Sequence, residues 1–261
     1  MSVLLEVADV NVHFGGVRAV DGIDFDLETG CLYGLVGPNG SGKSTLLGAL
    51  SRMTNLTSGR LVFAGEEYQT YSPAKTARMG IGRTFQAVRL IPGLSVLENV
   101  MLGGDARTAG VGIFANWLLP WRTRNCERSC REGAMEAIER LELTGLEKRT
   151  AGMLPYGTQR RVEIARALAA KPDLLLFDEP TAGMNREERD EVGEVMRSLR
   201  GQGLTQVLVG HDMQMITEVC DYVFVMNFGK VIAQGDPEAV VADPLVQEAY
   251  LGKRGSKNAT A

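Results

Sequence analysis

The chain has 261 residues, of which 44% are apolar and 23% charged, and its formal net charge is −4. That much apolar material forms a full globular core, which excludes disordered and fibrous classes, and the length fits either one large α/β domain or two small domains. Lys and Arg total 28 against 32 Asp and Glu, so there is no summed positive field to hold a nucleic acid, and we expect no nucleic-acid partner.

The lengths of the apolar runs and the number of cysteines indicate the cellular compartment in which we expect the chain. No run approaches the roughly 20 apolar residues that a membrane-spanning helix needs, and the start of the chain lacks the features of a secretory signal. The four cysteines are too few for a disulfide framework and fit a reducing compartment, so we expect the cytoplasm. Cys126 and Cys130 share helical i, i+4 spacing, but without a nearby His or further Cys a plain helix face is favoured over a metal site.

The first 86 residues predict short strands and one strand–loop–helix unit. From Lys43 the apolar spacing becomes helical. A turn at Asp21-Gly22 is expected to separate two of the strands, and a further strand pair is expected to follow the helix. The expected strands are Leu4–Val10, Val17–Val20, Ile23–Leu27, Leu32–Val36, Gly59–Phe63 and Gly80–Phe85.

The rest of the chain alternates helices and strands after a mostly helical insertion at about residues 87–158. The insertion is expected to be loop-like to about Gly112 and helical from about Cys126 to Leu143. This alternation predicts a parallel sheet covered on both faces. The expected elements are helices Gln159–Ala170 and Arg186–Arg200, strands Leu174–Phe177, Thr205–Val209, Tyr222–Met226 and Val231–Ala233, and two helices starting at Asp236 and Asp243, before a disordered tail at 253–261.

A phosphate-binding loop is predicted between the strand that ends at Val36 and the helix that begins at Lys43. Its glycines let the backbone wrap around phosphate oxygens, and the helix N-terminus adds positive potential. Lys43 is expected to contact the β- and γ-phosphates of a nucleotide, and the Ser44 hydroxyl to ligate Mg²⁺. The motif reads Gly37-Pro38-Asn39-Gly40-Ser41-Gly42-Lys43-Ser44, and Thr45 follows it among the expected ATP-binding residues.

Two acidic residues end the buried strand that begins at Leu174. Asp178 is expected to hold Mg²⁺ through water, and Glu179 to polarise the attacking water. An apolar run that ends in acids is also an ordinary strand end. The pairing of these acids with a phosphate loop favours the catalytic interpretation.

A Gly turn and a basic amphipathic helix follow Leu154, and with the two preceding motifs they carry a family resemblance. Over about residues 3–252 the chain resembles the ATP-binding subunits of ABC transporters. The resemblance implies a P-loop NTPase with a mostly parallel core sheet, an N-terminal antiparallel β-subdomain and a helical insertion. It implies a single domain, 1–252, with the core at about 1–86 and 159–235, the insertion at 87–158 and C-terminal helices at 236–252.

In that family, ATP lies between the phosphate loop of one subunit and the signature loop of another. The resemblance places Tyr156, Gly157 and Thr158 in the signature loop. It also implies that Ala182–Asn185 crosses the dimer interface and that Mg²⁺ accompanies ATP.

Three further residues match family positions. Phe14 matches the aromatic residue that stacks on adenine, with a core or turn phenylalanine as the alternative. Gln86 matches the loop glutamine that contacts Mg²⁺ and links the site to the insertion, and His211 matches the histidine that contacts the γ-phosphate. His13 has no such support and is treated as a surface residue.

Within the family, the chain is most similar to the ATP-binding subunit of branched-chain amino-acid importers. The motifs that carry this likeness are Arg83-Thr84-Phe85-Gln86, Tyr156-Gly157 and Ala249-Tyr250-Leu251-Gly252. The implied partners are transmembrane permease subunits, a second ATP-binding subunit and, through the permease, an extracytoplasmic binding protein. The chain is then expected at the cytoplasmic face of the membrane. A soluble ABC protein outside transport and a P-loop small-molecule kinase remain alternatives.

The signature loop departs from the family pattern, and the role of the helical insertion has two interpretations. Pro155 and Tyr156 stand where the family has Ser and Gly, and because proline has no N–H, one donor to the γ-phosphate is missing. We therefore expect an asymmetric pair of ATP sites, in which the site completed by this signature loop hydrolyses ATP slowly.

For the helical insertion, we favour a groove that faces a partner, with an ordinary packed connection as the alternative. The aromatic and basic residues of the insertion are Phe114, Trp117, Trp121, Arg122, Arg124, Arg128 and Arg131.

Overall fold

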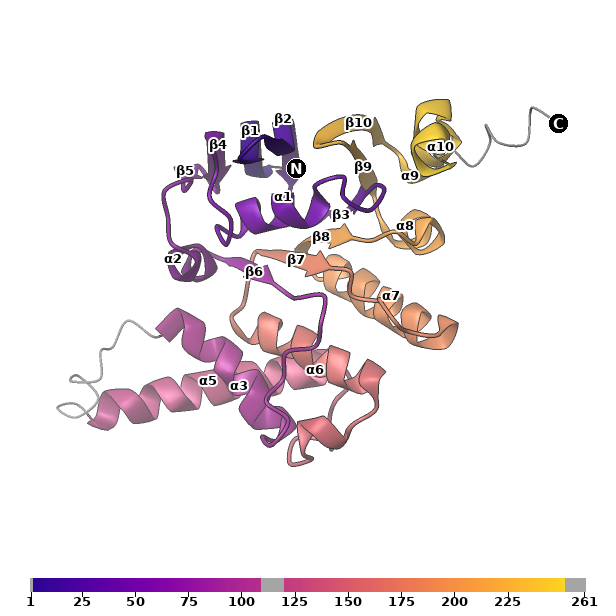
Figure 1. Ribbon diagram of the computed structural model, residues 1–261. Helices are drawn as coiled ribbons and strands as arrows, with labels where there is room; N and C mark the ends of the chain where they lie inside the picture. The colour runs from indigo at the N-terminus through magenta and orange to yellow at the C-terminus, as the bar shows by residue number, and fades with distance from the viewer. Residues whose placement is uncertain (1, 109–119, 252–261) are drawn as a thin grey trace.

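The computed structural model describes residues 2–108 and 120–251, which form two sheets with helices between and around them (Figure 1). Phe114, Trp117 and the tail at 253–261 lie outside the described residues. Among the described residues, no helix combines the length and the apolar character needed to cross a bilayer.

The central sheet has the strand order β10-β9-β3-β8-β7-β6. Neighbouring strands are parallel, except that β10 is antiparallel to β9, so the expected mostly parallel sheet is confirmed. Every residue of β3, β7 and β8 is buried, which explains their nearly continuous apolar sequences. The strands are β3 (Leu32–Val36), β6 (Ile81–Arg83), β7 (Leu174–Asp178), β8 (Thr205–Val209), β9 (Tyr222–Asn227) and β10 (Lys230–Gly235).

The second sheet is antiparallel, with the order β2-β1-β4-β5 for β1 (Val3–Phe14), β2 (Val17–Glu28), β4 (Ser58–Phe63) and β5 (Glu66–Glu67). The turn expected at Asp21-Gly22 is wrong, because β2 continues through these two residues. Val10 pairs with Ile23 and Val12 with Val20, so two residues of β2 face Asn11 alone in a β-bulge. Gly22 has φ +64 and donates its N–H to Asn11 Oδ1 at 2.7 Å, which replaces a ladder bond.

The expected pairing of the strands near Gly59 and Gly80 is also wrong. β4 belongs to the antiparallel sheet and β6 to the central sheet, with α2 (Pro73–Arg78) between them. The strands share no sheet because β6 pairs in parallel with β7, which comes from a distant part of the chain.

Helix α1 (Lys43–Leu50) lies between the two sheets (Figure 1), and the alternation of strand side chains divides the core in two. Leu174 and Leu176 of β7 pack with Leu46 and Leu50 in the core between the sheets. Their neighbours in β7, such as Phe177, pack on the other face among the helices. α1 is therefore held on both sides, and its N-terminus has a set position.

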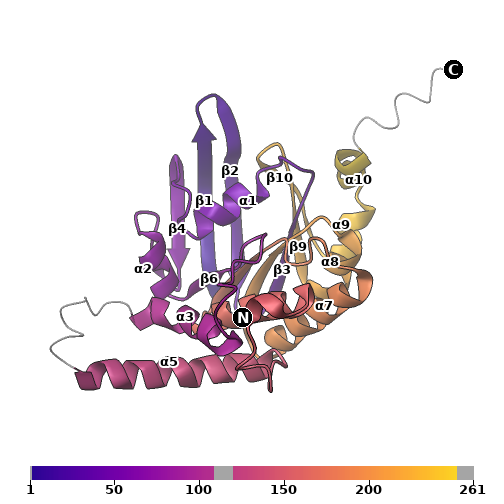
Figure 2. The same ribbon diagram turned by 60° about the horizontal axis from the view of Figure 1, so that its bottom comes forward.

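Helices α3 (Val96–Thr108), α5 (Pro120–Arg140) and α6 (Tyr156–Ala169) pack together at one end of the molecule (Figure 2), with a 3-10 turn at Ala151–Met153. The loop expected up to Gly112 is wrong over α3. Ser95 and Glu98 form a reciprocal cap at the start of this helix. Because α6 begins at Tyr156, the boundary expected at 158/159 falls within its first turn.

The remaining helices cover the central sheet on the side away from α1. They are α7 (Arg186–Gly201), α8 (Met213–Val219), α9 (Pro237–Ala242) and α10 (Pro244–Leu251). The helix expected at Arg186–Arg200 and the two starts at Asp236 and Asp243 are confirmed, whereas α8 was not expected.

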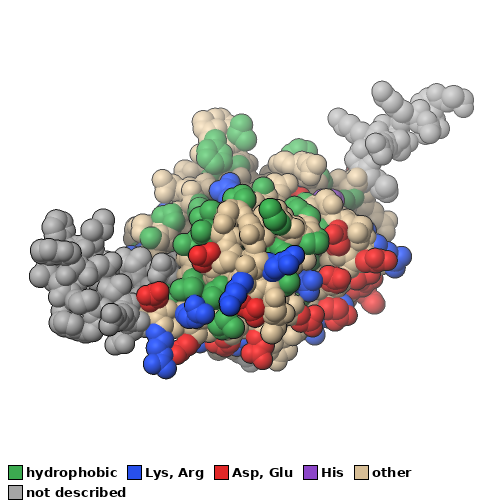
Figure 3. All heavy atoms as spheres, turned by 90° about the horizontal axis from the view of Figure 1, so that it is seen from below, with side chains coloured by type: hydrophobic (Ala, Val, Ile, Leu, Met, Phe, Trp, Pro, Cys, Tyr) green, Lys and Arg blue, Asp and Glu red, His purple; other side chains and the backbone are tan. Residues whose placement is uncertain are grey.

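The face at the helical end carries charges of both signs side by side (Figure 3). On α5, opposite charges pair one helical turn apart, as Arg128 does with Glu132 at 2.9 Å and Arg140 with Glu136 at 2.8 Å.

Candidate functional site

The predicted phosphate loop connects β3 to α1, and two of its glycines are required by close backbone approaches. Gly37 has φ +148, and a Cβ there would lie 2.1 Å from the Met226 carbonyl oxygen. Gly42 has φ +105, and its Cβ would lie 2.1 Å from the carbonyl oxygen of Ala19. The loop is thus packed tightly against β9 and β2, and any side chain at these positions would displace it.

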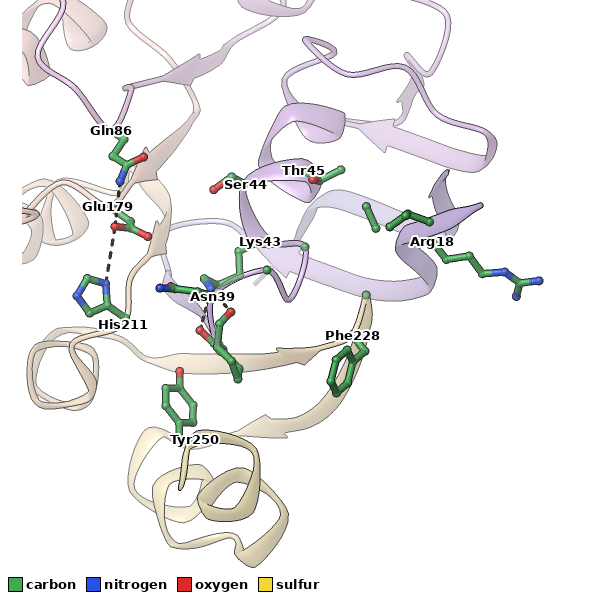
Figure 4. A pocket seen from close by; sticks show the side chains of 17 residues that line it. Arg18, Asn39, Lys43, Ser44, Thr45, Gln86, Glu179, His211, Phe228 and Tyr250 are labelled. Carbon is green, nitrogen blue, oxygen red and sulfur yellow. Dashed lines mark hydrogen bonds and ion pairs between the residues drawn. The ribbon is translucent and has the colours of Figure 1, made fainter. Parts of the chain in front are cut away.

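The loop opens into a cavity of about 900 Å³ (Figure 4). Parallel strands of one sheet present their carboxyl ends at the same edge, so the segments after β3, β6, β7 and β8 converge there. The cavity is lined by ten of the predicted site residues, Pro38, Asn39, Gly40, Gly42, Lys43, Ser44, Thr45, Gln86, Glu179 and His211, together with Val17, Arg18, Ala19, Gly37, Phe228, Gly229 and Tyr250.

Lys43 is buried beneath the loop. Its Nζ donates to the carbonyl oxygens of Gly37 at 2.7 Å and Pro38 at 2.9 Å. Burial lowers the pKa of the Lys43 ammonium, and the charges of Glu179 and Asp178 partly oppose this shift. The loop carbonyls therefore hold the ammonium in place for a phosphate.

Asp178 lies beside the first turn of α1. Its Oδ1 accepts a hydrogen bond from the Ser44 hydroxyl at 3.3 Å, and its Oδ2 accepts one from Arg83 Nη2 at 2.8 Å. Arg83 is therefore a site residue whose role its sequence motif does not predict. Its position three residues before Gln86 was visible, but the contact with Asp178 depends on the pairing of β6 with β7.

Glu179 links the two other predicted residues of this edge (Figure 4). Its Oε2 accepts a hydrogen bond from Gln86 Nε2 at 3.4 Å and lies 3.7 Å from His211 Nδ1. The Glu179 backbone is left-handed, with φ +46, and its N–H donates to the Val209 carbonyl at 3.0 Å. A non-glycine residue in this region is strained, and such strain is typical of functional sites.

Other predicted site residues lie outside this cavity. Phe14 is 56% exposed at the tip of the β1–β2 hairpin, opposite Val17, which does line the cavity. Ser41 is buried in the loop and lines a neighbouring pocket.

Tyr156, Gly157 and Thr158 also lie apart from the cavity, in the first turn of α6. Pro155 occupies the N-cap position of this helix and provides no side-chain cap. A Cβ on Gly157 would lie 3.4 Å from Glu188 Oε1. One chain by itself therefore does not bring its signature loop to its own phosphate loop.

Arg18, Phe228 and Tyr250 line the cavity but were not predicted as site residues. Tyr250 comes from α10 and points toward the phosphate loop (Figure 4). Burial raises the pKa of its hydroxyl to about 12. Tyr250 belongs to the C-terminal motif that resembles branched-chain importers, and this motif was the sequence feature that could have identified it as a site residue.

Oxygen donors suited to a hard cation meet at Ser44 and Asp178. Among the described residues, no group of three or more His, Cys, Asp or Glu side chains is arranged to hold a metal on its own. A hydroxyl and one carboxylate are enough protein ligands for an ion such as Mg²⁺ when phosphate oxygens supply the rest.

Family models match two parts of the chain. One, described as ABC transporter, matches residues 20–182, which include the phosphate loop, Asp178 and Glu179. The chain belongs to the ABC transporter family of ATP-binding proteins. A second model, described as branched-chain amino acid ATP-binding cassette transporter, matches residues 230–255.

Curated relatives agree with this assignment. The high-affinity branched-chain amino acid transport ATP-binding protein BraF of Pseudomonas aeruginosa is 36% identical over 251 residues, which are 96% of this chain and 98% of BraF. LivG of Escherichia coli, with the same description, is 34% identical over the same shares. Ribose import ATP-binding protein RbsA 3 of Rubrobacter xylanophilus is 36% identical over 89% of this chain but only 44% of its own length.

Solved structures show the same fold. A nucleotide-free ATP-binding cassette from an ABC transporter superposes with a TM-score of 0.84 at 29% identity, covering 97% of this chain and 100% of that one. The ADP conformation of such a cassette gives the same TM-score, identity and coverage. This ABC chain is accordingly a nucleotide-binding ATPase of a transport system, and the small-molecule kinase alternative is excluded.

Proposed function

We propose that the cavity of this ABC ATPase binds ATP with Mg²⁺, and that its hydrolysis energises import of branched-chain or other hydrophobic amino acids or related small amides. The main support for this proposal is that Lys43, the Ser44–Asp178 pair and Glu179 lie together at one edge of the central sheet. Each group has the chemistry that one part of the reaction needs.

We assign the cation to Ser44 and Asp178, with Gln86 facing the same cavity. When bound there, Mg²⁺ would neutralise charge on the β- and γ-phosphates. Arg83 holds one Asp178 oxygen at 2.8 Å and leaves the other directed at Ser44, so it orients the carboxylate. Lys43 and the loop amides bind the phosphates.

Glu179 is the proposed general base for the attacking water. As a water molecule attacks the γ-phosphorus, a proton of the water moves to the Glu179 carboxylate. The bond between the γ-phosphorus and the oxygen that bridges the β- and γ-phosphates breaks, which leaves ADP and phosphate. Gln86 and His211 approach this carboxylate from neighbouring strands, and we assign them to holding the water and the γ-phosphate.

Glu179→Gln tests this assignment. We expect the ATP hydrolysis rate to fall by about 10²- to 10⁴-fold, because the amide cannot accept the proton, while ATP binding is retained. Steady-state phosphate release and equilibrium ATP binding are the measurements. Glu139→Gln, an exposed change on α5, is the matched control and should hydrolyse ATP at the normal rate. Near-normal hydrolysis by Glu179→Gln would remove Glu179 from this role.

The substrate class rests on the C-terminal family match and on BraF and LivG. In ABC importers substrate choice belongs to other subunits, so we propose that this chain works with transmembrane permease subunits, a second ATP-binding subunit and a binding protein outside the membrane. Its proposed place is the cytoplasmic face. Similarity to a ribose importer covers less than half of that relative, so sugar import has weaker support.

The substrate proposal can be tested with the assembled transporter. The tagged chain is purified from its native membranes, its companion subunits are identified, and the complex is reconstituted in proteoliposomes with its binding protein. We expect ATP-dependent uptake of leucine, isoleucine or valine, which ribose does not compete for. Uptake of ribose without uptake of these amino acids would refute the substrate class but leave the ATPase assignment intact.

A further inference from the structure

Arg160, in the second turn of α6, is completely buried and reaches the backbone beside the catalytic edge. Its guanidinium donates to the carbonyl oxygens of Phe85 at 2.6 Å, Pro180 at 2.9 Å, Glu179 at 3.2 Å and Asp178 at 3.4 Å. One side chain thus contacts two segments that lie far apart in the sequence.

Both segments carry groups of the proposed site. Phe85 directly precedes Gln86, and Asp178 to Pro180 surround the proposed base Glu179. The Glu179 backbone is held at φ +46, a conformation that costs free energy unless neighbouring contacts support it. Arg160 binds the carbonyl of this residue and those on either side of it, so it supports the strained conformation directly.

The charge of Arg160 is balanced within the same helix. It pairs with Glu163, whose side chain is 1% exposed. Glu163 Oε1 also lies 3.7 Å from Arg166 Nη2 and accepts the Arg89 N–H at 3.4 Å. Because a buried ion pair is weak evidence for stability, the pair needs another reason to be there.

The geometry of the guanidinium supplies that reason. Arginine is planar and offers five donors in a fixed fork, so it can hold several carbonyls at once in one arrangement. A lysine ammonium is a single point with three donors and cannot span the same carbonyls. The contacts of Arg160 depend on this shape as well as on its charge.

We propose that Arg160 is a positioning residue for ATP hydrolysis: it fixes Glu179 and Gln86 relative to each other and ties both to α6, the helix that begins at Tyr156. This proposal rests on the function proposed above for Glu179. Arg160 does not line the nucleotide cavity, so it acts on the reaction through the backbone that it holds.

Arg160→Lys tests the proposal, because it keeps the charge but loses the fork. We expect kcat to fall at least about tenfold while the Kd for ATP stays within about threefold, since Lys43 and the phosphate loop are untouched. Arg197→Lys is the matched control: Arg197 also pairs with a glutamate and donates to a backbone carbonyl, that of Glu218, but far from the site on α7. It should retain the normal kcat.

Loss of stability alone must also be separated from loss of positioning. Val192→Ala creates a cavity in the core beneath α7 and provides a destabilised chain with an intact Arg160. If this variant loses kcat as Arg160→Lys does at an equal fall in Tm, the role of Arg160 is merely structural and the proposal is overturned.

A double variant covers the case in which Arg160→Lys does not fold. Arg160→Met with Glu163→Leu replaces the buried pair by apolar side chains of similar volume, a change that often preserves stability. We expect a folded chain that binds ATP with low kcat, and normal kcat would overturn the proposal. Glu179→Gln separates the two hypotheses. If it hydrolyses ATP normally, the proposed role of Glu179 as general base fails, and the positioning proposal fails with it. If it is inactive and both Arg160 variants are fully active, the positioning role alone fails.

Discussion

Lys43 combines burial with a positive charge in a loop built to receive phosphate. Burial holds the pKa of its ammonium below the usual 10.5, against the opposing pull of Glu179 and Asp178. A bound triphosphate adds negative charge close to Nζ, so it raises that pKa again. The charge of Lys43 and the affinity for ATP are therefore linked.

From this linkage we predict that ATP binding takes up protons in alkaline solution. Above the lowered pKa the free chain has lost the Lys43 proton while the complex retains it, so affinity falls as pH rises through that range. Calorimetry in buffers of different ionisation enthalpy, repeated at increasing pH below the usual lysine pKa of 10.5, measures the uptake. Binding with constant affinity and no proton uptake over this range would contradict the prediction.

At the scale of elements, the contact between α3 and α6 explains one of two adjacent glycines inside α3. A Cβ on Gly103 would lie 1.8 Å from the Arg166 carbonyl oxygen, whereas one on Gly104 would have its nearest neighbour, Cys130, at 3.4 Å. The two positions are adjacent and have the same helix propensity. The difference between them comes from packing alone.

Substituting alanine at each position should therefore give opposite results. In a helix interior Gly→Ala gains about 0.5–1 kcal/mol, so Gly104→Ala should be neutral or slightly stabilising. Gly103→Ala must push α3 away from α6 and should cost about 1–3 kcal/mol. Denaturant unfolding of both variants gives the free energies, and equal values would show that α3 does not approach α6 this closely.

At the scale of the whole molecule, the proposed pairing of two chains would complete each nucleotide site. The cavity of one chain contains the phosphate loop and Glu179, while Tyr156, Gly157 and Thr158 lie elsewhere. In the hetero-pair that we propose, the Pro155 signature completes the partner's site, with one phosphate donor fewer.

The two sites of such a pair should hydrolyse ATP unequally. Glu179→Gln in the assembled complex should remove most of the activity, because Glu179 works against the partner's signature. The corresponding substitution in the partner should reduce activity by well under about twofold, since that slow site contributes the smaller part of the total. Phosphate release by each mutant complex is the measurement, and equal losses would rule out the asymmetry.

Some site residues and elements could be predicted from the sequence, and others could not. The phosphate loop was predictable because its glycines, Lys43 and Ser44 are consecutive and follow an apolar strand. The alignment of Glu179 with Gln86 and His211 needed only the family order and the rule that parallel strands end at one edge. α3 was missed because its Gly103 and Gly104 read as loop residues, although packing against α6 requires the first of them.

Local order of residues was thus sufficient to predict the phosphate loop and most of the residues that line its cavity, because each motif spans only a few neighbouring positions. Long-range pairing decided the rest. The contacts of Arg83 with Asp178 and of Arg160 with the Glu179 backbone join residues 95 and 19 positions apart. Such contacts depend on which strands pair and on where α6 packs. The sequence around a charged residue does not show which distant residue it will contact, so these contacts could not be predicted.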